Sequence, residues 1–151
     1  MRISDLLKPE NVIADLCVAD KGRALRELAR RAASLAGLPE TVVRDALLAR
    51  EELGSTGLGA GVAIPHTRIA GLDGVHTVFA RLSKPIDFDA VDGRLVDLIY
   101  LLLAPEGAGS AHLAALACAA RALRNPTTAK KLRETTDADA LYAILAEPSV
   151  G

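Results

Sequence analysis

The feature that most constrains the fold is a nearly unbroken apolar run over residues 95–103, interrupted only by Asp97. Strands that are buried on both faces of a sheet have such runs, because neither face meets water. The run therefore predicts a buried central strand. It is too short to cross a bilayer, which takes about 20 apolar residues, so we expect no membrane insertion.

Other segments are predicted to be extended because their apolar residues alternate or lie between turn residues. They are residues 12–18, 62–64, 75–82 and 86–88. The strand over 62–64 should end or become an edge at Pro65, which cannot donate to a ladder, so that His66 is presented at a strand end. The glycine-rich segment 54–61 is expected to be a flexible loop, and Asp92-Gly93 a turn.

Helices are predicted on both sides of these strands. The segments are residues 3–7, 20–37 with Asp20 as N-cap and Gly37 as stop, 40–53 opened by Pro39, 110–125 capped by Ser110, 126–135, and a last helix capped by Asp137. In the helix after Ser110, the residues predicted to face inward are Leu113, Leu116, Ala117, Ala120 and Leu123. The predicted fold class is α/β, a single domain over residues 1–151 with a mixed central β-sheet covered by helices on both faces.

Composition excludes some functions. Acidic and basic residues nearly balance, at a net charge of −1, which argues against a general nucleic-acid binder. The start of the chain has no long apolar segment of a secretory signal. Cys17 and Cys118 both lie among apolar residues, and we interpret them as two buried thiols in a reducing compartment. The expected location is the cytoplasm.

Two histidines stand where backbone geometry favours chemistry. His66 follows a glycine-rich segment and a short strand, and a neutral imidazole is a nucleophile near neutral pH because its reference pKa is about 6.5. His112 would be the second residue of its helix, where the helix dipole favours a neutral ring and attracts an anion. Arg50 continues the apolar stripe of its helix, either to stabilise the helix end or to offer a guanidinium fork to a phosphate. These three residues are candidates for phosphoryl transfer.

Simpler interpretations stay open on this evidence. His66 is also compatible with an ordinary loop histidine and His112 with an ordinary helix start. A dinucleotide loop is disfavoured, because a helix precedes the glycines and a strand follows them. Ser55, His66 and Asp73 lack the nucleophile-elbow motif of a hydrolase, and the histidine spacing does not support a metal site. The third histidine, His76, is expected to have a packing or surface role.

Five segments together carry a family resemblance. They are Ile-Ser-Asp-Leu-Leu at 3–7, Arg-Glu-Glu-Leu-Gly-Ser-Thr-Gly at 50–57, Gly-Val-Ala-Ile-Pro-His at 61–66, Phe-Asp-Ala-Val-Asp-Gly at 88–93, and His-Leu at 112–113. In these segments the chain resembles the enzyme IIA domains of the bacterial phosphoenolpyruvate phosphotransferase system, of the fructose/mannitol type. Within that family it is most similar to the nitrogen-regulatory enzyme IIA proteins.

The resemblance implies a site and partners. It implies that His66 is phosphorylated, that Arg50 and His112 flank the phosphoryl group, and that Ser55 and Thr56 lie nearby. The donor would be a histidine-containing phosphocarrier protein charged by enzyme I from phosphoenolpyruvate, and no metal or cofactor is expected. The chain would be a phosphohistidine carrier rather than a stand-alone enzyme.

The chain departs from the family pattern in two places. The family usually has Gly and then Arg after the active histidine, whereas Thr67 precedes Arg68 here, and Ala60 stands where Asn is frequent. We expect the β-branched Thr67 to change the rate or the partner fit of transfer rather than abolish it. The favoured function is a regulatory, nitrogen-type phosphocarrier that binds target proteins according to its phosphorylation state. The alternatives are a sugar-specific enzyme IIA that donates to a IIB component, and a binding module that has lost phosphotransfer.

Overall fold

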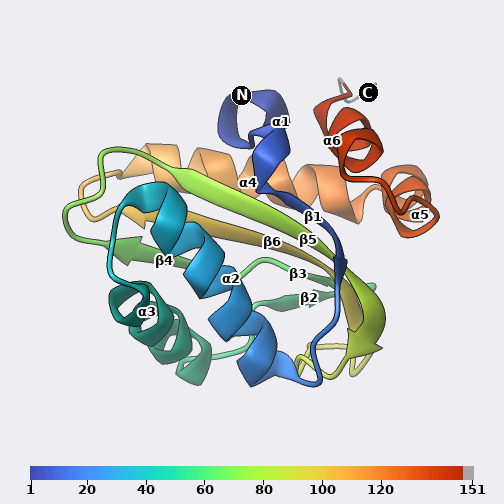
Figure 1. Ribbon diagram of the computed structural model, residues 1–151, viewed down its shortest axis with the longest axis horizontal. Coiled ribbons are helices and arrows are strands. Elements are labelled where there is room, and N and C mark those ends of the chain that lie inside the picture. The colour runs from blue at the N-terminus through green and yellow to red at the C-terminus, as the bar shows by residue number, and fades with distance from the viewer. Residues whose placement is uncertain (148–151) are drawn as a thin grey trace.

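The computed structural model describes residues 1–147, and a six-stranded mixed sheet forms its centre (Figure 1). The strands are β1 (Val12–Leu16), β2 (Gly57–Gly59), β3 (Val62–Ala63), β4 (His66–Ile69), β5 (His76–Ile86) and β6 (Val96–Pro105). Their order is β1-β5-β6-β3-β2, and β4 also pairs with β6. β6 runs antiparallel to β5 and parallel to β3 and β4. The strand predicted from the apolar run is therefore β6, and its central position is confirmed.

Helices cover both faces of the sheet, as predicted. They are α1 (Ile3–Leu6), α2 (Lys21–Ala36), α3 (Glu40–Glu52), α4 (Ser110–Arg124), α5 (Pro126–Arg133) and α6 (Ala138–Ala146), with a short 3-10 turn at Pro9–Asn11. Figure 1 shows α2 and α3 over one face and α1, α4, α5 and α6 along the other. None of the helices in residues 1–147 is long and apolar enough to cross a membrane.

The burial of β6 on both faces explains why its sequence is apolar except at Asp97. Ile99, Leu101 and Leu103 are buried among residues of α2 and α3 on one face. Leu98 and Tyr100 are buried on the other face, in a cluster that includes Leu123 of α4 and Leu141 of α6. Each face of this strand therefore contributes to its own hydrophobic core, and both cores exclude water from the sheet.

Local capping signals were predicted well. The Asp20 carboxylate accepts a hydrogen bond of 2.8 Å from the Arg23 amide at the start of α2. Gly37 ends that helix in the left-handed region, at φ 68°, where glycine carries no Cβ penalty. The Asp137 side chain caps α6, as predicted. These features depend only on neighbouring residues, so sequence alone identifies them.

Three strand predictions need correction. The segment predicted as a flexible loop contains β2, whose Gly57 pairs with Ala63 and approaches Ala90 so closely that a Cβ would lie 2.9 Å from its Cα atom. His66 follows the end of β3, as predicted, but it also begins β4, a strand that was not predicted. Ile86 belongs to β5, because it pairs across an irregularity with Val96 of β6.

The predicted inward face of α4 was correct only in part. Leu123 is buried, and Leu116 and Ala120 pack against the core, as predicted. Leu113 is 61% exposed, whereas His112, Ala115 and Ala119 are buried, because the helix packs its small residues and His112 against the sheet. Its N-cap is Gly109, at φ 57°, rather than Ser110. Of the two thiols predicted to be buried, Cys118 is buried and Cys17 is exposed.

Candidate functional site

His66 is held by the central strand. It is the first residue of β4 and lies in register with Leu102 of β6, whose amide donates to the carbonyl of Pro65 at 2.9 Å. Its Nδ1 atom lies 2.8 Å from the carbonyl oxygen of Ile64. Because a carbonyl only accepts, Nδ1 carries the hydrogen. In the neutral ring, the lone pair is then on Nε2.

His112 lies beside His66. The ring centroids are 5.7 Å apart and the planes are tilted by 48°. His112 is the third residue of α4, one position later than predicted, and only 6% of it is exposed. Burial lowers the pKa of His112, and the neighbouring His66 and Arg68 lower it further. Its Nδ1 atom has no hydrogen-bond partner within residues 1–147, so a neutral ring with an unused nitrogen stands next to His66.

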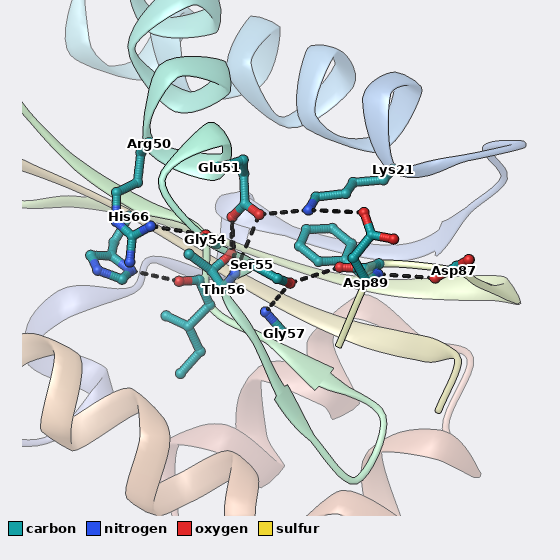
Figure 2. Close-up of polar contacts among 12 residues, drawn as sticks. Lys21, Arg50, Glu51, Gly54, Ser55, Thr56, Gly57, His66, Asp87 and Asp89 are labelled. Carbon is teal, nitrogen blue, oxygen red and sulfur yellow. Dashed lines mark hydrogen bonds and ion pairs between the residues drawn. The ribbon is translucent and has the colours of Figure 1, made fainter. Parts of the chain in front are cut away.

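Arg50 comes from a third element. It lies in the last turn of α3, which packs against β4, and its Nη1 atom donates to the carbonyl of Gly54 at 3.0 Å. Figure 2 shows its side chain running from α3 toward His66. The fold therefore places the Arg50 side chain toward His66. One N–H group of Arg50 also binds the loop that follows α3.

The hydroxyl groups of Ser55 and Thr56 already donate hydrogen bonds within the protein. The Ser55 hydroxyl donates to the Phe88 carbonyl at 2.7 Å and accepts from the Gly57 amide at 3.0 Å. The buried Thr56 hydroxyl donates to the Glu51 carboxylate, which also accepts from the Thr56 amide. Each hydroxyl has one hydrogen. In this arrangement both side chains hold the loop, and neither has a free O–H to offer a ligand.

Glu51 and Lys21 were missed as site residues. The Lys21 ammonium lies 2.8 Å from the Glu51 carboxylate, 3.6 Å from that of Asp89, and 4.8 Å from the ring centroid of Phe88. Figure 2 shows this chain of contacts extending from the loop after Arg50 toward the start of α2. In sequence, Glu51-Glu52 resembles any charged helix end, and only the fold brings Lys21 to it.

Thr67 and Arg68 follow His66 along β4. Side chains alternate along a strand, so Arg68 is on the same face as His66 and Thr67 is on the other, opposite Leu103 in register. Arg68 lies close enough to His112 to affect its pKa. The period of two was the available signal for Arg68, which was not predicted as a site residue.

The third histidine has a different partner. His76 Nε2 lies 2.8 Å from the Asp73 carboxylate. The hydrogen bond from His76 lowers the pKa of Asp73. Asp73 thus contacts His76 rather than His66, which agrees with the rejection of a hydrolase triad. The site contains His66, His112, Arg50 and Arg68, with the Glu51 contacts behind it.

Comparisons with known proteins show the family of the chain. Residues 5–147 match the family described as the phosphoenolpyruvate-dependent sugar phosphotransferase system, EIIA 2. A nitrogen regulatory protein of Bradyrhizobium diazoefficiens is 53% identical over 148 residues, which are 98% of this chain and 97% of that protein.

Solved structures share the fold. The crystal structure of the nitrogen regulatory protein IIA-Ntr from Neisseria meningitidis superimposes with a TM-score of 0.90 at 38% identity, covering 95% of this chain and 98% of that one. IIA mannitol from Escherichia coli, at 24% identity and a TM-score of 0.78, covers 93% of this chain and 99% of that one, and shares the fold. The chain therefore belongs to the EIIA 2 family of the phosphoenolpyruvate-dependent sugar phosphotransferase system.

Proposed function

We propose that this chain accepts a phosphoryl group on Nε2 of His66 from a histidine-containing phosphocarrier protein. The observation that carries the proposal is the 2.8 Å contact between His66 Nδ1 and the carbonyl of Ile64. That contact occupies Nδ1 as a donor and leaves the lone pair of the neutral ring on Nε2. One nitrogen of His66 is thus the nucleophile, and its ring is oriented before a donor arrives.

The transfer step exchanges one P–N bond for another. The Nε2 lone pair forms a bond to phosphorus, and the bond between phosphorus and the donor's imidazole nitrogen breaks, with its electron pair returning to that nitrogen. Both histidines start or finish as neutral rings, so the step needs no oxidant and no net proton. The remaining requirement is stabilisation of the charge on the phosphoryl oxygens.

His112, Arg50 and Arg68 would supply that stabilisation. A guanidinium presents a planar fork that matches phosphate oxygens, and Arg50 has further N–H groups beyond the one bound to Gly54. His112 offers a ring N–H in its neutral form. Its lowered pKa keeps it from adding a third fixed positive charge to those of Arg50 and Arg68, so the phosphoryl group stays transferable to a later acceptor.

We further propose a regulatory, nitrogen-type role, in the cytoplasm, through phosphorylation-dependent binding of target proteins. A phosphoryl group adds about −1.5 to −2 charges at neutral pH to the surface around His66. Leu113, next to His112, is 61% exposed and Leu53, at the end of α3, is 85% exposed, which favours a protein as partner. The 53% identity to a protein named nitrogen regulatory protein supports this role over donation to a IIB component of sugar uptake.

Intact-mass spectrometry tests the proposal. The protein is incubated with enzyme I, its phosphocarrier and phosphoenolpyruvate, beside His66→Ala and His76→Ala variants. We expect the wild-type and His76→Ala proteins to gain one acid-labile phosphate and His66→Ala to gain none. A wild-type protein that gains no phosphate from a cognate donor overturns phosphotransfer and favours a binding module. Rapid loss of the label to a fructose- or mannitol-type IIB domain would instead favour the sugar-specific role.

A further inference from the structure

A second concave site lies away from the histidines. A cavity of about 350 Å³ opens between α4, α5 and the turn that connects β2 to β3. Its apolar lining includes Leu123 and Ala129, and its lining residues as a whole come from four separate segments of the chain. Small-molecule sites in proteins have volumes of about 300 to 1,000 Å³, so this cavity is large enough for a compact ligand.

The lining of the cavity is strongly basic. Arg94, Arg124 and Lys130 all line it, and none of them forms an ion pair with another residue of the described chain, 1–147. Glu134 is the one acidic residue in the lining. The whole chain carries a net charge of −1. Three basic side chains without an ion-pair partner among residues 1–147 therefore give this cavity a local excess of positive charge that the whole chain does not have.

The fourth basic residue of the lining, Arg133, holds the walls of the cavity together through hydrogen bonds. Arg133 donates from Nε to the Asp97 carboxylate at 3.0 Å and from Nη2 to the Ala60 carbonyl at 2.8 Å, which joins α5 to β6 and to the turn. Asp92 accepts from the amides of Ala60 and Arg94, and these backbone hydrogen bonds lower its pKa. The Asp97 and Asp92 carboxylates thus form hydrogen bonds that stabilise the walls of the cavity. The side chains of Arg94, Arg124 and Lys130 form no ion pair with either carboxylate.

The cavity is separate from the site around His66. Arg94 lies just before the start of β6 at Val96, whereas His66 is in register with Leu102. The six residue steps from Val96 to Leu102 correspond to about 20 Å along a strand. In Figure 1, α5 and the β2–β3 turn lie at the right of the view and β4 lies at the left. A ligand in the cavity would not contact the histidines.

We propose that this basic cavity binds a small phosphorylated anion, no larger than a mononucleotide. Guanidinium groups bind phosphate oxygens through paired N–H donors, and an ammonium adds a point charge. Two arginines and a lysine lining one cavity match the charge of a diphosphate group, whereas a monoanion would leave much of their charge uncompensated. The proposal concerns binding and does not depend on phosphotransfer at His66.

Titrations followed by two-dimensional ¹H–¹⁵N NMR test it. Pyrophosphate, ADP and uncharged adenosine are added separately to the full-length protein at physiological salt. We expect saturable shifts with pyrophosphate and ADP at the amides of Ala60, Arg94 and Lys130, and none with adenosine. Tighter binding of ADP than of pyrophosphate would assign part of the site to the nucleoside, and equal binding would assign it to the diphosphate alone.

Matched variants separate a built site from general charge attraction. The double substitution Arg124→Ala/Lys130→Ala should weaken binding by about tenfold or more, since it removes two charged donors. The control Arg31→Ala/Lys84→Ala removes the same charges from exposed positions on α2 and β5 and should leave affinity within about twofold. His66→Ala should bind like wild type. Non-saturable shifts, equal loss in both double variants, or loss of binding in His66→Ala would each overturn the proposal.

Discussion

The Lys21 ammonium lies 2.8 Å from the carboxylate of Glu51, and that same carboxylate accepts both the amide and the hydroxyl of Thr56. The Glu51 side chain is only 6% exposed. One buried charge thus connects the start of α2, the end of α3 and the loop that follows Arg50. Glu51 directly follows Arg50 in α3, so these contacts lie beside the arginine of the candidate site.

Replacing Lys21 with Ala should destabilise the protein by about 1 to 3 kcal/mol, because it leaves the buried Glu51 carboxylate without its cation. Urea unfolding at neutral pH measures the difference. Lys84→Ala removes an exposed lysine from β5 and should change stability by no more than about 0.5 kcal/mol. Equal effects of the two substitutions would show that the Lys21–Glu51 contact does not contribute to folding.

Replacing Arg50 with Ala should slow phosphorylation of His66 by about 100-fold, the usual loss when one donor to a developing oxyanion is removed. Rapid-quench transfer from the phosphorylated donor protein measures the rate. Arg50→Lys should recover only part of it, because an ammonium lacks the paired donors of a guanidinium. Arg44→Ala, on the same helix, is the control. A rate for Arg50→Ala within a few-fold of this control would assign Arg50 a purely structural role.

His112 should titrate below 6.5, the ordinary value for histidine, because burial lowers its pKa, with smaller contributions from His66 and Arg68. NMR titration of its ring protons measures this value. Substituting Arg68 with Ala should raise the pKa of His112 but leave it below 6.5, since burial is the largest cause. A wild-type pKa at or above 6.5 contradicts the description of a buried, neutral ring.

The same shift links His112 to stability. Its folded-state pKa lies below the unfolded value of about 6.5, so the unfolded chain takes up the proton first. The contribution of the neutral ring should therefore be complete above pH 6.5 and decrease as pH falls from 6.5 toward the folded-state pKa. Urea midpoints measured across this interval should fall less steeply in His112→Gln than in wild type.

Gly37→Ala should cost about 1 kcal/mol, because an alanine at the end of α2 would have to adopt a φ of 68°. Gly74 provides the matched control. Its backbone is not in the left-handed region, and an added Cβ at either glycine meets no atom within 4 Å. Gly74→Ala should be neutral or slightly stabilising. Thermal unfolding of both variants separates backbone strain from steric clash, and equal melting temperatures would contradict the strain at Gly37.

Features that depend on nearby residues were predictable from sequence. The central position of β6 follows from its nearly continuous apolar pattern, and the ends of α2 follow from Asp20 and Gly37. The position of His66 after a strand end and that of His112 near a helix start were predicted for the same reason. Each of these predictions needed only a few neighbouring residues.

Features that depend on distant contacts were missed. β2 pairs with β3 through Gly57 and Ala63, and Gly57 also packs against Ala90. No local sequence pattern predicts the contact with Ala90. The rotation of α4, which buries His112 and exposes Leu113, is decided by how the helix packs on the sheet. Lys21 joins Glu51 from a different helix. In each case the partner lies far away in sequence.

Under the proposed function, the pairing of His66 with Leu102 would also determine how a partner protein distinguishes the phosphorylated form of this chain from the unphosphorylated form. Because His66 is paired within the central sheet, its backbone would keep the same conformation when a phosphoryl group is attached to the ring. The shape presented to a partner would stay constant while the electrostatic potential changes. Discrimination would then arise mainly in the rate of encounter, which depends on long-range charge. Ionic strength would set how strongly the two states differ, because added salt screens the one property that separates them.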